Sequence, residues 1–432
     1  MESGKTGYKD LLKQKDYLKL ISANIVNRFG DSIDAIAYEW LVYLLTGSAS
    51  WAALIFGINK IPTIFLQPIA GAAIEKMNKK NVMIVTDLIR GLCVAFIALS
   101  FYSGMLQPWM LIATTIIISS AEAFRMPCSS AVVVRVLSKE TIDYGVSLSS
   151  SVGTVVEMVG LAVAAGIIAT FGVSVAVGID AATFFGSALI ILTMNTHEVK
   201  SNETVVKGSY VKLLKEGGKY IVAKKLLFNF ILLSVLCNAV FVPINSLQAP
   251  MVSEVLKSNA IMLSVFSLTV SAGMLIGSIV FPMIANKISG KKLIVTVGLI
   301  LGLYHILLPL IGLTINNEFA KYIIVGTISI IVGFIFSLLS TYINATFYKI
   351  VERDYIARTG AIMNASGAAA VPIISFLVGI ITVRFATNVI FFITGGVIIV
   401  LLLVMAIVYE EEDTSEEEVT TVDEMKEKTE IA

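Results

Sequence analysis

The sequence predicts an all-α membrane protein in which twelve transmembrane helices form two bundles of six. Three observations lead to this fold class. Apolar residues make up 56% of the 432 residues and charged residues only 15%, against about 25% in soluble proteins. Twelve apolar segments are long enough to cross about 30 Å of hydrocarbon at about 1.5 Å per residue. One long polar stretch, residues 195–225, separates the first six segments from the last six.

Each apolar segment has 20 to 27 residues, and short connections join them within each half. The first bundle is predicted over residues 19–194 and the second over 226–408, with 195–225 as a cytoplasmic linker. The predicted helices span residues 19–45, 51–74, 82–102, 109–128, 145–170, 174–194, 226–248, 259–285, 293–313, 322–347, 358–382 and 387–408.

Both ends of the chain are polar. Residues 1–18 lack the apolar core and cleavage site of a signal peptide, and indicate a basic amphipathic arm at the inner membrane surface. Residues 409–432 hold eleven acidic residues, all from Glu410 onward, against two lysines. Because so few apolar residues accompany these charges, we expect this cytoplasmic tail to be disordered.

The basic residues indicate how the chain lies in the membrane. If both termini are cytoplasmic, 25 of the 32 Lys and Arg residues fall in inside segments and three, Lys257, Lys321 and Arg384, fall outside. Cytoplasmic loops carry an excess of Lys and Arg. The sequence therefore predicts a multi-pass protein of the cell membrane, of the bacterial inner membrane type, with both termini in the cytoplasm.

A weak internal repeat supports two related halves. The basic pair Lys79-Lys80 recurs as Lys291-Lys292 at an offset of 212 residues, and Gly145 recurs as Gly360 at an offset of 215. Duplicated bundles place a substrate path at the interface between the halves, near the middle of the bilayer, and alternate by rocking. The repeat therefore favours a transporter.

The loop after the second predicted helix reads GAAIEKMNKK and is followed by DLIR. A glycine, an acid four positions later and paired basic residues resemble the signature of the major facilitator superfamily in this loop. An acid at a helix end facing basic groups forms a latch that holds one conformation and opens in another; the alternative is an ordinary basic loop. The predicted latch comprises Gly71, Glu75, Lys76, Lys79, Lys80, Asp87 and Arg90.

Three further segments narrow the resemblance. NRFGDSIDAIAYEWLVYLLTGS (27–48), DLIRG (87–91) and IDAATF (179–184) resemble the drug–proton antiporters that include the macrolide efflux permeases. The resemblance implies proton-coupled export of hydrophobic or amphipathic compounds. One departure concerns the fifth helix, where antiporters have Gly-Pro and this chain has Gly160 followed by Leu161.

Charged residues deep in the first predicted helix are candidates for function, because a charge at mid-bilayer costs about 2.5–3.5 kcal/mol. Asp31 and Asp34 lie near the midplane, and Lys60 on the next helix is placed to neutralise one of them. The other carboxylate then binds a proton or a cation. The alternative is a fixed ion-pair cluster of these acids with Arg28 and Lys60.

Two other acids lie inside predicted spans. Glu157 has no basic residue within one turn of its own helix, which is typical of a proton-coupling or substrate-binding acid; the alternative is a structural, hydrogen-bonded acid. Glu122 and Arg125 are three residues apart and are predicted to pair with each other on one helix.

The second half offers uncharged polar groups instead. Such groups provide hydrogen bonds in an otherwise apolar cavity for a bulky amphipathic molecule, and each can alternatively serve helix packing. With one residue of the first helix, the predicted cavity residues are Asn27, Asn238, Asn245, Tyr342, Asn344 and Asn364.

The sequence contains none of the common enzyme or nucleotide-binding motifs, so we expect no enzyme activity, cofactor or metal site. We predict a monomeric secondary transporter whose partners are a small-molecule substrate, protons and the lipid bilayer, and not nucleic acid. Two alternatives remain: a uniporter or exporter of an endogenous metabolite or siderophore, and a non-transporting membrane scaffold or sensor that uses the acidic tail.

Overall fold

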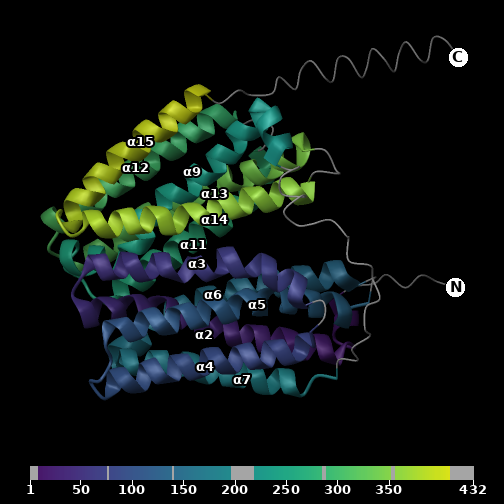
Figure 1. The fold of residues 1–432 in the computed structure, drawn as a ribbon. Coiled ribbons are helices and arrows are strands. Elements are labelled where there is room, and N and C mark those ends of the chain that lie inside the picture. Colours follow the sequence, from purple (N-terminus) through teal and green to yellow (C-terminus); the bar gives the residue numbers. More distant parts are fainter. Residues whose placement is uncertain are drawn as a thin grey trace, which may run out of the picture.

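The computed structural model describes residues 8–74, 77–138, 141–195, 218–284, 289–351 and 356–408. Within these ranges the chain is helical and contains no strand (Figure 1). The long helices of the first half are α2 (Lys15–Thr46), α3 (Ala49–Ala73), α4 (Lys79–Tyr102), α5 (Pro108–Val136), α6 (Ile142–Phe171) and α7 (Val173–Leu192). Those of the second half are α9 (Lys225–Ser246), α11 (Ala260–Ile284), α12 (Gly290–Thr314), α13 (Glu318–Ile350), α14 (Ile356–Ile381) and α15 (Thr387–Val408).

Short elements accompany the long helices. The single turn α1 (Tyr8–Leu11) precedes α2, and α10 (Gln248–Pro250) followed by the π-helix η3 (Met251–Val255) continues α9. Residues 196–217 of the predicted linker, the tail at 409–432 and the first seven residues of the arm lie outside the described residues, so the predicted domain boundaries stay predictions.

Eleven of the described helices are long and apolar enough to cross a membrane. Helix α2 is not among them, although it has 32 residues, because Arg28, Asp31, Asp34 and Glu39 interrupt its apolar run. The all-α membrane fold is therefore confirmed, and a count of twelve crossings stays a prediction.

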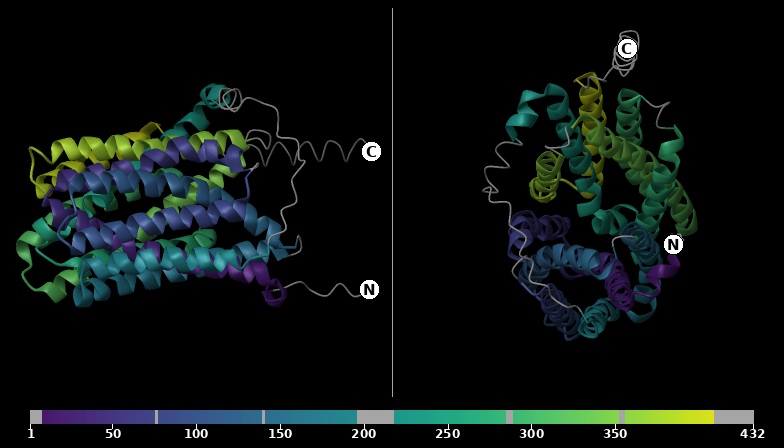
Figure 2. Two further views of the ribbon diagram at one scale, coloured as in Figure 1. Left: turned by 60° about the horizontal axis from the view of Figure 1, so that its bottom comes forward. Right: turned by 90° about the vertical axis from the view of Figure 1, so that its right-hand side faces the viewer.

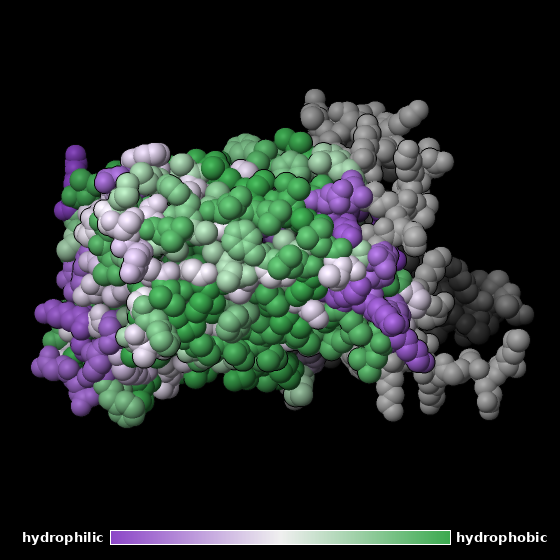
Figure 3. All heavy atoms as spheres, turned by 90° about the horizontal axis from the view of Figure 1, so that it is seen from below, coloured by the Kyte–Doolittle hydropathy of each residue, from purple (hydrophilic) through white to green (hydrophobic). Residues whose placement is uncertain are grey.

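The outer surface has the distribution of side chains that a bilayer requires. Figure 3 shows an apolar band across the middle of one face of the molecule, with hydrophilic residues gathered toward both ends. Large apolar side chains such as Leu92, Leu99 and Leu189 are more than half exposed on this surface. In water such a surface would be unfavourable by about 25 cal/mol per Å², whereas lipid covers it without this cost.

The helices pack as two groups of six, one above the other in Figure 1. In the first group α2 contacts α6 and α7, and α5 contacts α3 and α4; in the second, α13 contacts α11 and α12, and α14 contacts α9. Small residues let some of these helices approach closely. A Cβ atom on Gly273 of α11 would lie 2.1 Å from the Ile330 carbonyl oxygen of α13.

The two groups meet along α3 with α14 and α6 with α11. We call the end of the molecule where α2 begins and α15 ends the terminal end, and the opposite end the distal end. The right panel of Figure 2 shows the two halves as seen from the terminal end. Two hydrogen bonds join α3 to α14 at the distal end. Ser50 donates to the Gly379 carbonyl at 2.8 Å, and Ser375 donates to the Ala53 carbonyl at 2.5 Å.

A carboxylate adds a third connection there. Glu254 of η3 accepts hydrogen bonds from Tyr43 of α2 at 3.0 Å and from Thr387 of α15 at 2.5 Å. Its partner Tyr43 belongs to the first half, whereas Thr387 belongs to the second. The distal end is thus held closed by contacts between the halves.

Candidate functional site

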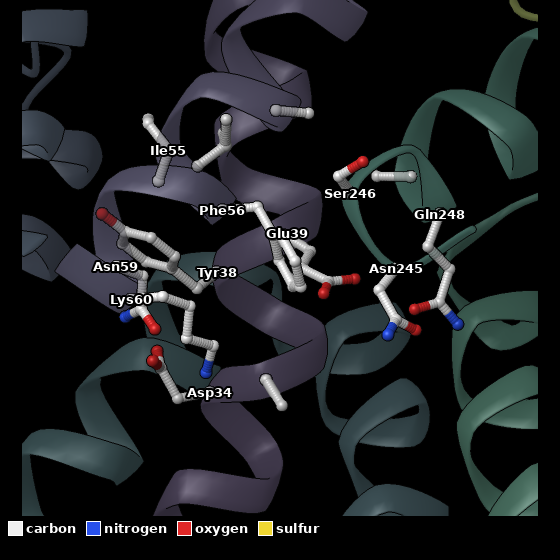
Figure 4. Close-up of a pocket in the computed structure, with 14 residues that line it drawn as sticks. Asp34, Tyr38, Glu39, Ile55, Phe56, Asn59, Lys60, Asn245, Ser246 and Gln248 are labelled. Atoms are coloured by element: carbon white, nitrogen blue, oxygen red, sulfur yellow. The ribbon is translucent and has the colours of Figure 1, made fainter. Parts of the chain in front are cut away.

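A cavity of about 250 Å³ lies between the two halves, near the distal closure. Helices α2 and α3 form one wall, and the end of α9 with α10 forms the other (Figure 4). Its polar lining residues are Asp34, Tyr38, Glu39, Asn59, Lys60, Asn245, Ser246 and Gln248. Apolar side chains, among them Val42, Ile55 and Phe56, fill the rest of the wall, which is the composition expected for a small-molecule site.

Helical spacing brings the polar residues of the first half onto this wall. Asp34 and Tyr38 are four residues apart on α2, and Phe56 and Lys60 are four apart on α3, so each pair shares one helix face. The opposite wall depends on an interruption: α9 ends at Ser246, and the chain continues as the single turn α10 and the π-helix η3. Broken helices and π-helices often present polar groups at binding sites.

The charged groups of the cavity are divided between two positions. Figure 4 shows the amine of Lys60 directed toward the carboxylate of Asp34, whereas the carboxylate of Glu39 points toward Asn245 on the other half. One oxygen of each acid, Asp34 Oδ1 and Glu39 Oε2, is buried and accepts no hydrogen bond from any described residue. Lys60 and Asp34 line the same side of the cavity, and the neutralisation of one acid of α2 by Lys60 stays a prediction.

Two other polar side chains of the cavity already have partners. The Tyr38 hydroxyl is 2.6 Å from Thr115 Oγ1 and donates to the Leu111 carbonyl at 3.2 Å. Asn59 donates to Ser119 Oγ at 3.0 Å. These bonds tie α2 and α3 to α5 and hold the wall of the cavity in place.

Asp31 has a different partner from those the sequence suggested. Its Oδ1 lies 2.7 Å from Arg90 Nη2 of α4, and Glu122 of α5 lies 3.9 Å from the same nitrogen. The Arg90 guanidinium also covers the Phe184 ring, 4.2 Å from its centroid. The expected cluster of Asp31 with Arg28 or Lys60 is therefore wrong, because Arg90 reaches Asp31 from a neighbouring helix.

Glu157 is also paired, contrary to the expectation that it has no basic neighbour. Arg28 of α2 donates to Glu157 of α6 at 2.5 Å. Both side chains remain partly accessible, with 53% of Arg28 and 37% of Glu157 exposed. The expectation considered only one turn of the same helix, and the partner comes from another.

The predicted ion pair between Glu122 and Arg125 is replaced by two pairs across helices. Arg125 forms a buried ion pair with Asp87 of α4, while Glu122 lies near Arg90. Ser187 of α7 donates to Asp87 Oδ2 at 2.7 Å. Asp87 and Arg90 are thus engaged inside the first half.

The other described residues of the predicted latch lie at the terminal end. Lys80 donates to the carbonyls of Leu192 and Met194, at 2.8 and 2.6 Å, and so satisfies the C-terminal end of α7. Lys79 is buried, and Gly71 lies in the last turn of α3. Glu75 and Lys76 lie outside the described residues, so the latch stays a prediction.

The six predicted polar cavity residues do not come together. Asn245 lines the cavity, whereas Asn238 and Asn344 donate to carbonyls of their own helices at 2.9 Å. Of the remaining three, Tyr342 packs near Phe230, Asn364 is exposed on α14, and Asn27 is buried. Sequence reasoning did not select Glu39, Tyr38, Asn59 or Gln248. For Tyr38 the available signal was its position four residues after Asp34, on the same face of the helix.

Within the described residues, no group of three His, Cys, Asp or Glu side chains is arranged to hold a metal ion. The polar residues of the cavity are instead hydrogen-bonding groups and three charges around an apolar space. This arrangement suits reversible binding of a small molecule.

Known proteins resemble this chain in sequence. Macrolide efflux protein A of Streptococcus pyogenes is 21% identical over 343 residues, which cover 79% of this chain and 83% of that protein. The multidrug efflux pump Tap of Mycobacterium bovis is 22% identical over 291 residues, which cover 66% of this chain and 69% of the pump.

Solved structures share the fold. The nucleoside transporter NupG has a TM-score of 0.73 at 14% identity, with 92% of this chain and 100% of that one covered. A bacterial homologue of the iron transporter ferroportin, in an inward-facing state, has a TM-score of 0.69 at 12% identity, with 91% and 98% covered.

A family model described as "Transmembrane secretion effector" matches residues 10–430, nearly the whole chain. The relatives are transporters of the major facilitator type and efflux pumps, not enzymes. The protein therefore belongs to the Transmembrane secretion effector family, whose members are membrane transporters of the major facilitator superfamily.

Proposed function

We propose that the protein is a proton-coupled exporter of hydrophobic or amphipathic compounds, of the macrolide or multidrug kind. Macrolide and multidrug efflux proteins are among its relatives. The observation that carries the proposal is the cavity between the halves, in which Asp34 and Lys60 lie among other polar groups and the apolar side chains of Val42, Ile55 and Phe56. The apolar side chains bind the body of such a compound, and a carboxylate within the cavity exchanges a proton.

Transport then occurs by alternating access, with the two halves rocking around the cavity. We infer that both termini lie in the cytoplasm, because cytoplasmic loops carry an excess of Lys and Arg. The distal end then faces outward. The hydrogen bonds of Ser50, Ser375 and Tyr43 close that end. A substrate enters from the cytoplasm, and separation of these contacts exposes it to the outside.

Among the predicted proton sites, Asp34 has the strongest support. Asp31 and Glu157 each face an arginine at 2.7 and 2.5 Å, whereas Asp34 lies in the cavity beside Lys60 (Figure 4). A proton on Asp34 removes one negative charge from the cavity that Lys60 also lines, so the charge of the cavity changes with each proton. Entry of a proton from outside then favours substrate release and resets the carrier.

The test uses purified protein in liposomes, with ethidium and erythromycin as probes. With an acidic lumen, we expect probe uptake that stops when nigericin collapses the pH gradient. Asp34→Asn should abolish the dependence on the gradient and leave probe counterflow, which needs no coupling. Asp10→Asn, in the exposed pair with Lys13, is the control and should behave as the unmodified protein. Uptake that ignores the gradient would contradict proton coupling.

A second candidate is a uniporter or an exporter of an endogenous metabolite or siderophore. The ion pairs of Asp31 with Arg90 and of Glu157 with Arg28 favour it, because they occupy two of the three predicted coupling acids. The missing proline after Gly160 is consistent with the same candidate. Probe counterflow without any response to the pH gradient is its expected signature.

A further inference from the structure

Four lysines gather at the terminal end of the second half. Lys224 and Lys225 lie at the start of α9, and Lys291 and Lys292 lie at the start of α12. All four side chains are exposed. Both helices begin at this end, and a helix N-terminus carries a partial positive charge. We call the surface formed by these four lysines the basic face.

Helix packing places the end of α15 at the basic face. Asn229, in the second turn of α9, donates to the carbonyl of Val408, the last residue of α15, at 3.4 Å. Helix α12 runs antiparallel beside α15 (Figure 1), and a Cβ on Gly298 would lie 2.7 Å from Leu402 Cβ. Six residues further toward the terminal end on each helix, from 298 to 292 and from 402 to 408, Lys292 is level with Val408.

The segment that follows α15 has the opposite charge. Residues 409–432 contain eleven acids, and seven of these fall between Glu410 and Glu418. Helices α9, α12 and α15 contain no Asp or Glu. Because a chain spans at most about 3.5 Å per residue, the acids from Glu410 to Asp413 lie within about 18 Å of Val408. Acids and basic face are therefore complementary in charge and close together.

The terminal end of the first half uses its lysines differently. Lys13 pairs with Asp10 at 2.7 Å, and Lys19 donates to the Thr193 carbonyl at 2.6 Å. Lys80 donates to carbonyls at the end of α7. Each of these contacts stays within the first half. The second half is therefore where we expect a partner for the tail, beside its own exit.

We propose that residues 410–418 of the acidic tail dock on the basic face of the second half. Single surface ion pairs contribute little to binding, but the tail is tethered beside its site. Tethering makes the binding intramolecular, with an effective concentration on the order of millimolar for a short linker. The docked tail occupies a surface that anionic lipid head groups otherwise contact. This interaction lies outside the cavity and does not depend on the transported substrate.

The experiment measures the fluorescence anisotropy of a label on the tail of the full-length protein. The native cysteines, Cys93, Cys128 and Cys237, are replaced by alanine, and Ser415→Cys carries the label. The protein is placed in nanodiscs of neutral phosphatidylcholine. Between 0.1 M and 1 M NaCl the anisotropy should fall about 2-fold, because the screening length shrinks from about 10 Å to about 3 Å and releases the tail.

Two double variants with equal loss of charge locate the docking site. Lys291→Gln with Lys292→Gln should give, at 0.1 M NaCl, the low anisotropy that the unmodified lysines give only at 1 M. Lys13→Gln with Lys15→Gln removes two exposed charges from the first half and should leave the anisotropy unchanged. Lys291→Arg with Lys292→Arg keeps the charge and should keep the tail held, which separates lost docking from misfolding. Equal anisotropy in the two Gln double variants would overturn the proposal.

Anionic lipid is the competing occupant of the basic face. Phosphatidylglycerol in the nanodiscs should lower the anisotropy, because its head groups compete with the tail for the same lysines. Retention of phosphatidylglycerol that depends on Lys291 and Lys292, with an anisotropy that salt does not change, would assign the basic face to lipid and overturn docking of the tail. Anisotropy is measured without substrate, so this failure is distinct from failure of the proposed transport function.

Discussion

Arg90 and Asp31 join α4 to α2 through a contact of 2.7 Å in the interior of the first half. The Arg90 side chain is 5% exposed, and Glu122 lies 3.9 Å from the same guanidinium nitrogen. One arginine therefore serves two carboxylates from two helices. This contact orients α2, the helix that also places Asp34 and Glu39 at the cavity.

Arg90→Met should lower the free energy of unfolding by about 3 kcal/mol, because it leaves carboxylates in the interior without their partner. Asp31→Asn in the same chain should recover about 1 kcal/mol or more, since residues in contact show coupling of about 0.5–3 kcal/mol. Unfolding by SDS in mixed micelles, followed by tryptophan fluorescence, measures both. Arg135→Met, on an exposed turn of α5, is the control. Equal losses for Arg90→Met and Arg135→Met would contradict the role of this contact.

A second prediction concerns Ser187, whose hydroxyl donates to Asp87 at 2.7 Å. Both residues are fully buried, and Asp87 also pairs with Arg125. Ser187→Ala should destabilise the protein by about 2 kcal/mol, the cost of removing a hydrogen bond to a charged group. Ser130→Ala, on the exposed side of α5, should stay within about 0.5 kcal/mol. If both variants unfold at the same SDS fraction, Ser187 does not stabilise this ion pair.

Helix positions were largely predictable, because length and apolar content decide whether a segment can span a membrane. The predicted segment at 387–408 coincides with α15, and the one at 82–102 differs from α4 by three residues at its start. The interruption after Ser246 was not predictable. Apolar residues continue through Met251 and Val252, so hydropathy alone does not distinguish a regular helix from a π-helix.

The site was predictable only in part, for a related reason. Asp34 and Lys60 could be selected because each is a charge deep in an apolar segment, where charges are rare. The partner of Asp31 could not, since Arg90 is 59 residues away in sequence and no local spacing rule relates the two. Glu39 is not among the predicted site residues, although it belongs to the cavity wall.

A third prediction tests movement at the distal end. A Cβ atom on Gly379 would lie 3.9 Å from Ser50 Oγ, within the reach of a disulfide. In a chain whose three native cysteines are replaced by alanine, the pair Ser50→Cys with Gly379→Cys should form a disulfide under oxidation. The cross-linked protein should stop transporting ethidium, because α3 and α14 cannot separate, and dithiothreitol should restore transport.

A disulfide within one half is the matched control for the cross-link. A Cβ on Gly326 of α13 would lie 3.4 Å from Thr269 Cγ2 of α11, and both helices belong to the second half. Gly326→Cys with Thr269→Cys should therefore oxidise without stopping transport. Undiminished transport by the oxidised Ser50→Cys, Gly379→Cys protein would show that the distal contact need not open.

The last prediction concerns the close approach of α11 and α13. A Cβ on Gly273 would lie 2.1 Å from the Ile330 carbonyl oxygen, a backbone atom that cannot rotate away. Gly273→Ala should therefore force the helices apart and lower the free energy of unfolding by about 3 kcal/mol, at the upper end of overpacking costs. Gly166→Ala on α6 meets no atom within 4 Å, so it should leave stability unchanged or raise it by about 1 kcal/mol through helix propensity. Unfolding by SDS measures both, and equal midpoints for the two variants would contradict the close packing of α11 on α13.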